Sequence, residues 1–179
     1  MKNKLQIEKI NIDKLIKKYQ TPLYVYSYNK LKNNYKKLTN ILKKNIYYSV
    51  KANSNQAIIS LFSKLGSGID VVSGEELQRA LKAKVNPNKI IFEGVGKSKD
   101  DLRLAIKKNI RQINIKSVGE IEITNKLAKS LKRKINVGIR INPNIDGKTK
   151  KKISTGLDHN KFGINLKDLK KTIDKIKSS

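Results

Sequence analysis

The chain has 179 residues, enough for one domain of ordinary size. It has no cysteine and one histidine, which excludes a disulfide framework, a thiolate metal site and a His-rich metal site. The formal net charge of +27 is typical of nucleic-acid-binding proteins, but Lys, Ile and Asn together account for 80 residues and only 5 of the basic residues are arginine. Because lysine, isoleucine and asparagine have AT-rich codons, we attribute the charge to genome composition and keep nucleic-acid binding as a less favoured alternative.

The sequence contains no targeting or membrane-spanning signal that we can identify. No apolar run approaches the roughly 20 residues that cross a bilayer, and residues 1–9 lack the apolar core of a signal peptide. We therefore expect a cytoplasmic protein without a membrane partner.

Short apolar strands alternate with amphipathic helices along the chain. A first strand is predicted at Leu23–Tyr26, after Thr21-Pro22. Further strands are predicted at 46–50, 69–72, 89–92, 112–115 and 135–141. Helices are predicted at 28–42, 56–65, 74–83, 99–107, from the Ser117 cap to about 131, and at 166–176. A polar, lysine-rich loop is predicted from Asn142 to about Asn160.

This βαβα order predicts a parallel sheet with helical crossovers. A doubly wound sheet and a (β/α)₈ barrel both fit it. No Gly-x-Gly-x-x-Gly follows a strand, which weakens the dinucleotide-binding version of the first. A complete barrel needs about 250 residues, so we expect an incomplete (β/α)₈ barrel with about five of its eight βα units.

Some motifs have ordinary structural explanations. Gly94–Ser98 resembles the end of a phosphate-binding P-loop, but that pattern requires glycine at position 91, which is Ile91. His159 has no second histidine with which to share a metal ion. Glu75 and Glu76 fall in the first turn of a predicted helix, where the helix dipole explains them.

Lys51 follows the apolar run Ile46–Val50 and is the best candidate for chemistry. Active sites of parallel barrels lie at the C-terminal ends of the strands. A lysine desolvated there would have a lowered pKa and could form an imine with a carbonyl, although lysines that extend to solvent at strand ends are common. Asp70 and Arg140 come from other predicted strands. They could bind charged parts of a ligand, or pair with each other or with nearby lysines.

Seven sequence blocks, in the same order and spacing, resemble the N-terminal part of the diaminopimelate decarboxylase family. They are TPLYVYS (21–27), YYSVKANSN (47–55), GSGIDVVSGEEL (66–77), IFEGVGKS (91–98), INIKSVGEIE (113–122), RINPNID (140–146) and ISTGLDHNKFGI (153–164). These enzymes depend on pyridoxal 5′-phosphate and have a barrel similar to that of alanine racemase. The chain departs from them at Lys116, where the family often has an acidic residue.

The resemblance implies that Lys51 holds the cofactor and that Asp70 and Arg140 line its site. It implies decarboxylation of meso-diaminopimelate to L-lysine, with an amino-acid substrate and a homodimer for the full-length family. Residues 1–27 would carry a strand that joins a β-domain, and 28–179 would form a truncated cofactor-binding barrel. The other parts of the family site lie in a C-terminal half, which we expect to be separately encoded or lost. A truncated or decayed product without activity of its own is the alternative.

Overall fold

A computed structural model describes residues 5–43, 45–145, 148 and 163–177. The chain divides into two compact units, residues 1–46 and residues 47–179. The predicted loop from Asn142 to Asn160 lies mostly outside the described residues, as do His159 and most of the 153–164 block.

The first unit is built from a short hairpin and two helices. Its elements are β1 (Gln6–Ile7), β2 (Ile10–Asn11), α1 (Ile12–Tyr19) and α2 (Tyr28–Leu42). The Glu8 carboxylate accepts hydrogen bonds from the Ser27 hydroxyl and the Asn29 backbone N–H, both at 2.7 Å. These bonds lower the pKa of Glu8. Glu8 therefore supplements Ser27 at the N-terminus of α2, where backbone N–H groups lack partners within the helix.

The residues of the strand predicted at Leu23–Tyr26 are not paired as a strand in the described chain. These residues form no strand within the described chain, and all four side chains are exposed. An apolar and aromatic run has strand propensity, but it becomes a strand only when another strand pairs with it. The hairpin of β1 and β2 was not predicted, because two residues a strand give no periodicity.

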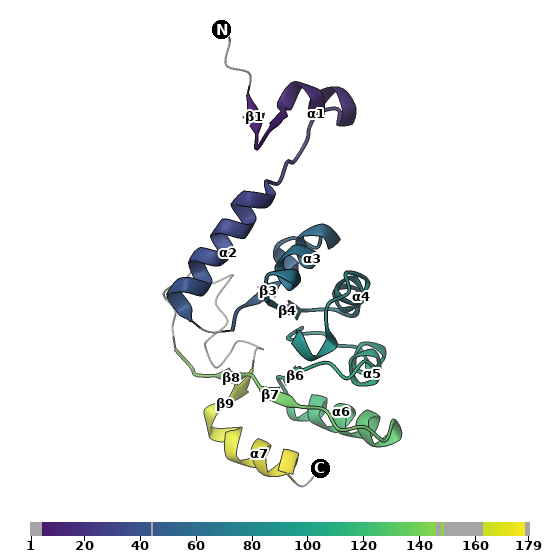
Figure 1. Ribbon diagram of the computed structural model, residues 1–179. Helices are drawn as coiled ribbons and strands as arrows, with labels where there is room; N and C mark the ends of the chain where they lie inside the picture. Colours follow the sequence, from purple (N-terminus) through teal and green to yellow (C-terminus); the bar gives the residue numbers. More distant parts are fainter. Residues whose placement is uncertain (1–4, 44, 146–147, 149–162, 178–179) are drawn as a thin grey trace. The chain divides into compact units, whose positions relative to one another are not determined.

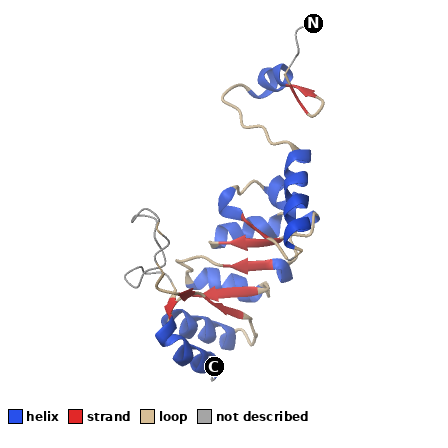
Figure 2. Cartoon of the chain, turned by 90° about the vertical axis from the view of Figure 1, so that its left-hand side faces the viewer, coloured by secondary structure: helices blue, strands red, loops and turns tan. Residues whose placement is uncertain are grey.

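The second unit contains a five-stranded parallel sheet in the order β3-β4-β5-β6-β7. Its strands are β3 (Tyr47–Ser49), β4 (Gly68–Val71), β5 (Ile90–Phe92), β6 (Gln112–Ile115) and β7 (Val137–Ile139). The strands lie side by side in chain order, as expected for consecutive βα units (Figure 2). The five strands predicted from residue 46 onward are confirmed, with ends that differ by a few residues.

Four helices connect these strands and agree closely with the prediction. They are α3 (Gln56–Lys64), α4 (Gly74–Lys82), α5 (Lys99–Lys107) and α6 (Val118–Ser130). Ser73, Ser98 and Ser117 accept backbone N–H bonds at the starts of α4, α5 and α6. Each cap ends a strand-to-helix loop at a defined residue and thereby fixes where the next helix begins.

All four connecting helices lie on one face of the sheet (Figure 1). Ile69 and Val71 of β4 belong to the same buried cluster as Ile59, Leu77 and other helix residues. A doubly wound sheet carries helices on both faces, whereas a barrel carries them all outside. Helices on one face and strands in chain order therefore identify an open segment of a (β/α) barrel.

After β7 the chain contributes to a second, two-stranded sheet. Strand β8 (Ile141–Asn142) pairs in parallel with β9 (Ile164–Asn165), and a 3-10 turn at Leu166–Asp168 leads into α7 (Leu169–Lys177). The sequence predicted the helix but not β9. Among the described helices, none is long and apolar enough to cross a membrane.

Candidate active site

Lys51 lies where the sequence placed it, directly after the C-terminal end of β3. Val50, Lys51 and Ala52 form a single 3-10 turn, in which Val50 is fully buried. The Lys51 side chain is exposed. The expected desolvation of Lys51 is therefore wrong for the described chain.

Asp70 lies on β4, opposite Ser49 of β3 in the parallel register. Because side chains alternate along a strand, Asp70 faces away from the helix-covered side on which Ile69 and Val71 are buried. Burial raises the pKa of the Asp70 carboxyl, and the charge of Glu93 adds to the rise. The Ser49 hydroxyl and the charge of Lys51 lower it. Charged residues that follow the two neighbouring strands, β3 and β5, therefore both influence the pKa of Asp70.

Glu93 follows β5 and is a site residue that the sequence analysis missed. Its carboxylate accepts a bond of 3.1 Å from the Arg140 guanidinium, which follows β7. It also accepts a bond from the Asn114 side chain on β6. Both partners of the ion pair are partly exposed, at 31% for Arg140 and 27% for Glu93. Arg140 therefore pairs with Glu93, an acceptor that was not among those considered from the sequence.

Asp70, Glu93 and Arg140 form a row of charged groups at the C-terminal ends of the strands, which we call the charged edge. Two buried lysines, Lys97 and Lys116, lie close to it. The Lys97 side chain is completely buried, with Nζ 2.6 Å from the Glu120 carboxylate and bonded to the carbonyls of Gly94 and Asn114 at 2.7 and 2.8 Å. Lys116 also donates to the Gly94 carbonyl. Burial, with the charge of Lys97, lowers the pKa of Lys116 to about 8. Neither lysine was predicted to take part in the site.

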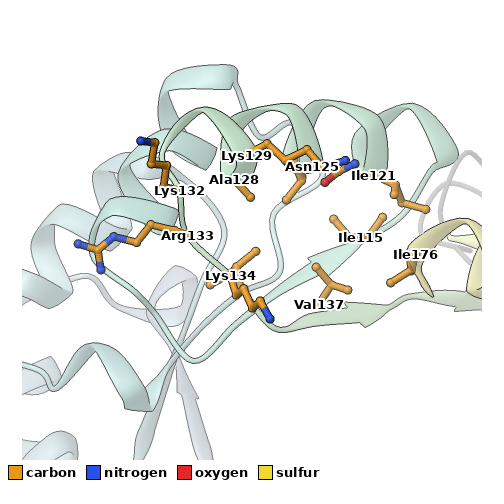
Figure 3. A pocket seen from close by; sticks show the side chains of 12 residues that line it. Ile115, Ile121, Asn125, Ala128, Lys129, Lys132, Arg133, Lys134, Val137 and Ile176 are labelled. Carbon is orange, nitrogen blue, oxygen red and sulfur yellow. The ribbon is translucent and has the colours of Figure 1, made fainter. Parts of the chain in front are cut away.

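A cavity of about 530 Å³ lies between α6, the strands β6 and β7, and α7. Ile115, Ile121, Val137 and Ile176 contribute apolar side chains to its wall, and lysines extend at its rim (Figure 3). Thr124 also lines it, and the buried Thr124 hydroxyl has no hydrogen-bond partner among the residues that the structure describes. None of the predicted site residues lines this cavity, so the charged strand ends remain the candidate active site.

An open barrel segment with a lysine after β3, an aspartate on β4 and an arginine after β7 is typical of parallel α/β-barrel enzymes, whose active sites lie at the C-terminal ends of the strands. A family model for "Pyridoxal-dependent decarboxylase, pyridoxal binding domain" matches residues 28–179. The chain belongs to this family, and the incomplete-barrel prediction is confirmed with it.

Among the curated proteins that this chain resembles are diaminopimelate decarboxylases. The enzyme of Helicobacter pylori strain J99 is 48% identical over 161 residues, which cover 88% of this chain and 40% of the relative. The enzyme of Methanocaldococcus jannaschii is 43% identical over 161 residues, covering 85% and 37%. The resemblance found in the sequence is confirmed. The chain spans about two fifths of the length of these curated relatives.

Solved structures of the same enzymes match the fold. The M. jannaschii decarboxylase in complex with L-lysine superposes with a TM-score of 0.87 at 39% identity, covering 98% of this chain and 43% of that one. The H. pylori decarboxylase complexed with L-lysine gives a TM-score of 0.88 at 42% identity, covering 94% and 44%.

Pyridoxal 5′-phosphate is the cofactor that this family implies, and the groups at the strand ends fit it. An exposed primary amine, that of Lys51, is the group that bonds to an aldehyde. The Asp70 carboxyl lies near enough for the Lys51 charge to act on it, and a guanidinium follows β7. These groups come from β3, β4 and β7, and because the strands are parallel they lie on the same side of the sheet, at the C-terminal ends of the strands.

Proposed function

We propose that this chain provides the lysine-bearing part of a diaminopimelate decarboxylase, which converts meso-diaminopimelate to L-lysine and carbon dioxide. The observation that carries the proposal is the exposed amine of Lys51 at the end of β3, electrostatically coupled to Asp70 on β4. Membership of the pyridoxal-dependent decarboxylase family and the similarity to diaminopimelate decarboxylases support it.

The reaction breaks the bond between the carbon of the D-centre and its carboxylate. Carbon dioxide leaves, and a proton takes its place on that carbon. When bound, pyridoxal 5′-phosphate supplies the electron sink for the bonding pair that remains. Lys51 Nζ would hold the cofactor, Asp70 would act on that amine through its charge, and Arg140 would bind an anionic group of the ligand.

The activity requires further chain. We propose that a C-terminal half, encoded separately or as a continuation, supplies the rest of the barrel and site. A complete barrel removes the open edges of the sheet, which are otherwise prone to pairing with other chains. A homodimer and a cytoplasmic location, both expected from the sequence, remain part of this proposal.

Borohydride trapping tests the role of Lys51. The chain is co-expressed with the C-terminal part of the H. pylori relative, incubated with pyridoxal 5′-phosphate, reduced and mapped by peptide mass spectrometry. We expect Lys51 to be labelled to near one equivalent, and Lys51→Ala to remove that equivalent together with lysine production. Lys64→Ala is the matched control, because Lys64 is an exposed lysine of α3 in the same unit.

Equal labelling of the Lys51→Ala and Lys64→Ala proteins would show that another amine holds the cofactor. Labelled Lys51 without production of lysine would instead support the alternative that the chain no longer has the activity of its relatives. Sequencing the DNA downstream of the Ser179 codon tests the separate proposal of a natural C-terminal half.

A further inference from the structure

Glu93 occupies a central place among the charged groups at the strand ends. It follows β5, the middle strand of the five, and bonds to groups that belong to β6 and follow β7. Its charge also acts on Asp70 of β4. The Glu93 carboxylate thus interacts with both Asp70 on β4 and Arg140 after β7, by its charge in the first case and by an ion pair in the second.

The geometry around Glu93 fixes the direction of the Arg140 guanidinium. The two carboxylate oxygens are used separately: Oε1 accepts from Arg140 at 3.1 Å, and Oε2 accepts from the Asn114 amide. The Gln112 side chain in turn donates to the Asn114 amide oxygen at 2.6 Å, so the amide is held from both ends. A charge-assisted bond to an anchored carboxylate limits the rotamers that a long arginine side chain can adopt.

The second effect of Glu93 is electrostatic. Asp70 lies between the amine of Lys51, whose charge favours the ionised carboxylate, and Glu93, whose charge opposes ionisation. The ionisation of Asp70 therefore depends on a residue two strand ends away from Lys51, as well as on Lys51 itself.

We propose that Glu93 is a positioning residue of this site, which holds the Arg140 guanidinium at the strand ends and places a second negative charge beside Asp70. The claim that Glu93 serves catalysis rests on the proposed function. The ion pair of Glu93 with Arg140 and the effect of the Glu93 charge on Asp70 can be tested without the cofactor.

The test compares Glu93→Gln with Glu122→Gln. Glu122 is also a glutamate of this unit in an ion pair, with Lys175, but its side chain is 51% exposed and its partner lies on α7. The two variants change the net charge equally. The first readout is the carboxyl ¹³C titration of Asp70 by NMR in the 179-residue chain.

Removing the Glu93 charge removes a cause that raises the pKa of Asp70, so we expect its titration midpoint to move to lower pH in Glu93→Gln. The Glu122→Gln midpoint should match that of the unaltered chain. Equal midpoints in all three proteins, or equal shifts in both variants, would overturn the proposal. If Glu93→Gln fails to fold, Glu93→Asp, which keeps the charge, serves instead: we expect its Asp70 midpoint to stay near that of the unaltered chain, and a large shift would overturn the proposal.

The second readout is the share of borohydride-trapped cofactor on Lys51 in the co-expressed protein. We expect this share to fall severalfold in Glu93→Gln and to be unchanged in Glu122→Gln. If Lys51 is unlabelled even without substitution, the proposed function fails, and the Asp70 midpoint still decides whether Glu93 acts as we infer.

Discussion

Replacing Lys116 with methionine should stabilise the protein at neutral pH and make its stability less dependent on pH. Lys116 is 9% exposed, and burial lowers the pKa of its amine from 10.5 to about 8. At pH 7 the Lys116 amine is protonated, and its burial and the nearby charge of Lys97 both disfavour that charged form. Methionine fills a similar volume and carries no charge, and the Gly94 carbonyl keeps its bond from Lys97 at 2.7 Å.

The magnitude follows from the shift in the pKa of Lys116. At about 1.4 kcal/mol per pKa unit, the difference between a pKa of 10.5 and one of about 8 sets an upper limit of about 3.5 kcal/mol. The shift already includes the favourable charges of the Glu93 and Glu120 carboxylates. Screening by water reduces the penalty further, so we expect a gain of roughly 1 to 2 kcal/mol. A lysine with a lowered pKa in the folded state destabilises the fold fully below about pH 8. The penalty disappears as pH rises toward 10.5, where the unfolded chain also loses the proton.

The assay is urea unfolding followed by far-UV circular dichroism at pH 7, 8, 9 and 10. The free-energy difference between Lys116→Met and the unaltered chain should be largest at pH 7 and shrink steadily above pH 8. Lys82→Met is the matched control, because Lys82 is exposed on α4 of the same unit. A Lys116→Met protein that is less stable at pH 7, or a difference that stays constant to pH 10, would refute this reasoning.

Two further substitutions test other buried groups of the second unit. Lys97→Met should destabilise by about 3 to 5 kcal/mol in the same urea assay, because it leaves the Glu120 carboxylate, 13% exposed, without its partner at 2.6 Å; a loss below 1 kcal/mol would contradict it. Thr124→Val should leave stability unchanged or raise it by about 1 kcal/mol, since the buried Thr124 hydroxyl has no partner to lose; a clear fall in the melting temperature would show that the hydroxyl has one.

The order of the βα units could be predicted from the sequence because each one carries local signals. The serines at 73, 98 and 117 start helices in the structure as their spacing indicates. The strand predicted at 23–26 had no such support, and its apolar residues are exposed in the described chain. A strand needs another strand to pair with, often one from a distant part of the chain, and the propensity of its own residues carries no information about that partner.

The candidate site was predicted in part. Lys51, Asp70 and Arg140 were found by asking which charged residues lie at the ends of predicted strands. The same question would have found Glu93, which directly follows Phe92 of β5. The roles of Lys97 and Lys116 could not have been found in this way, because their partners belong to other strands and loops, and their burial depends on how the strand ends pack together.

The charged edge forms within a barrel segment because parallel strands all end on the same side. Lys51, Asp70, Glu93 and Arg140 each come from a different βα unit, and the contacts between neighbouring units fix their order along the edge. Closure of the barrel is not needed to bring Glu93 to Arg140 or Lys51 to Asp70, since both couplings are present in the described residues. The remaining strands of the family barrel would therefore enclose a row of groups that the first five strands have already assembled.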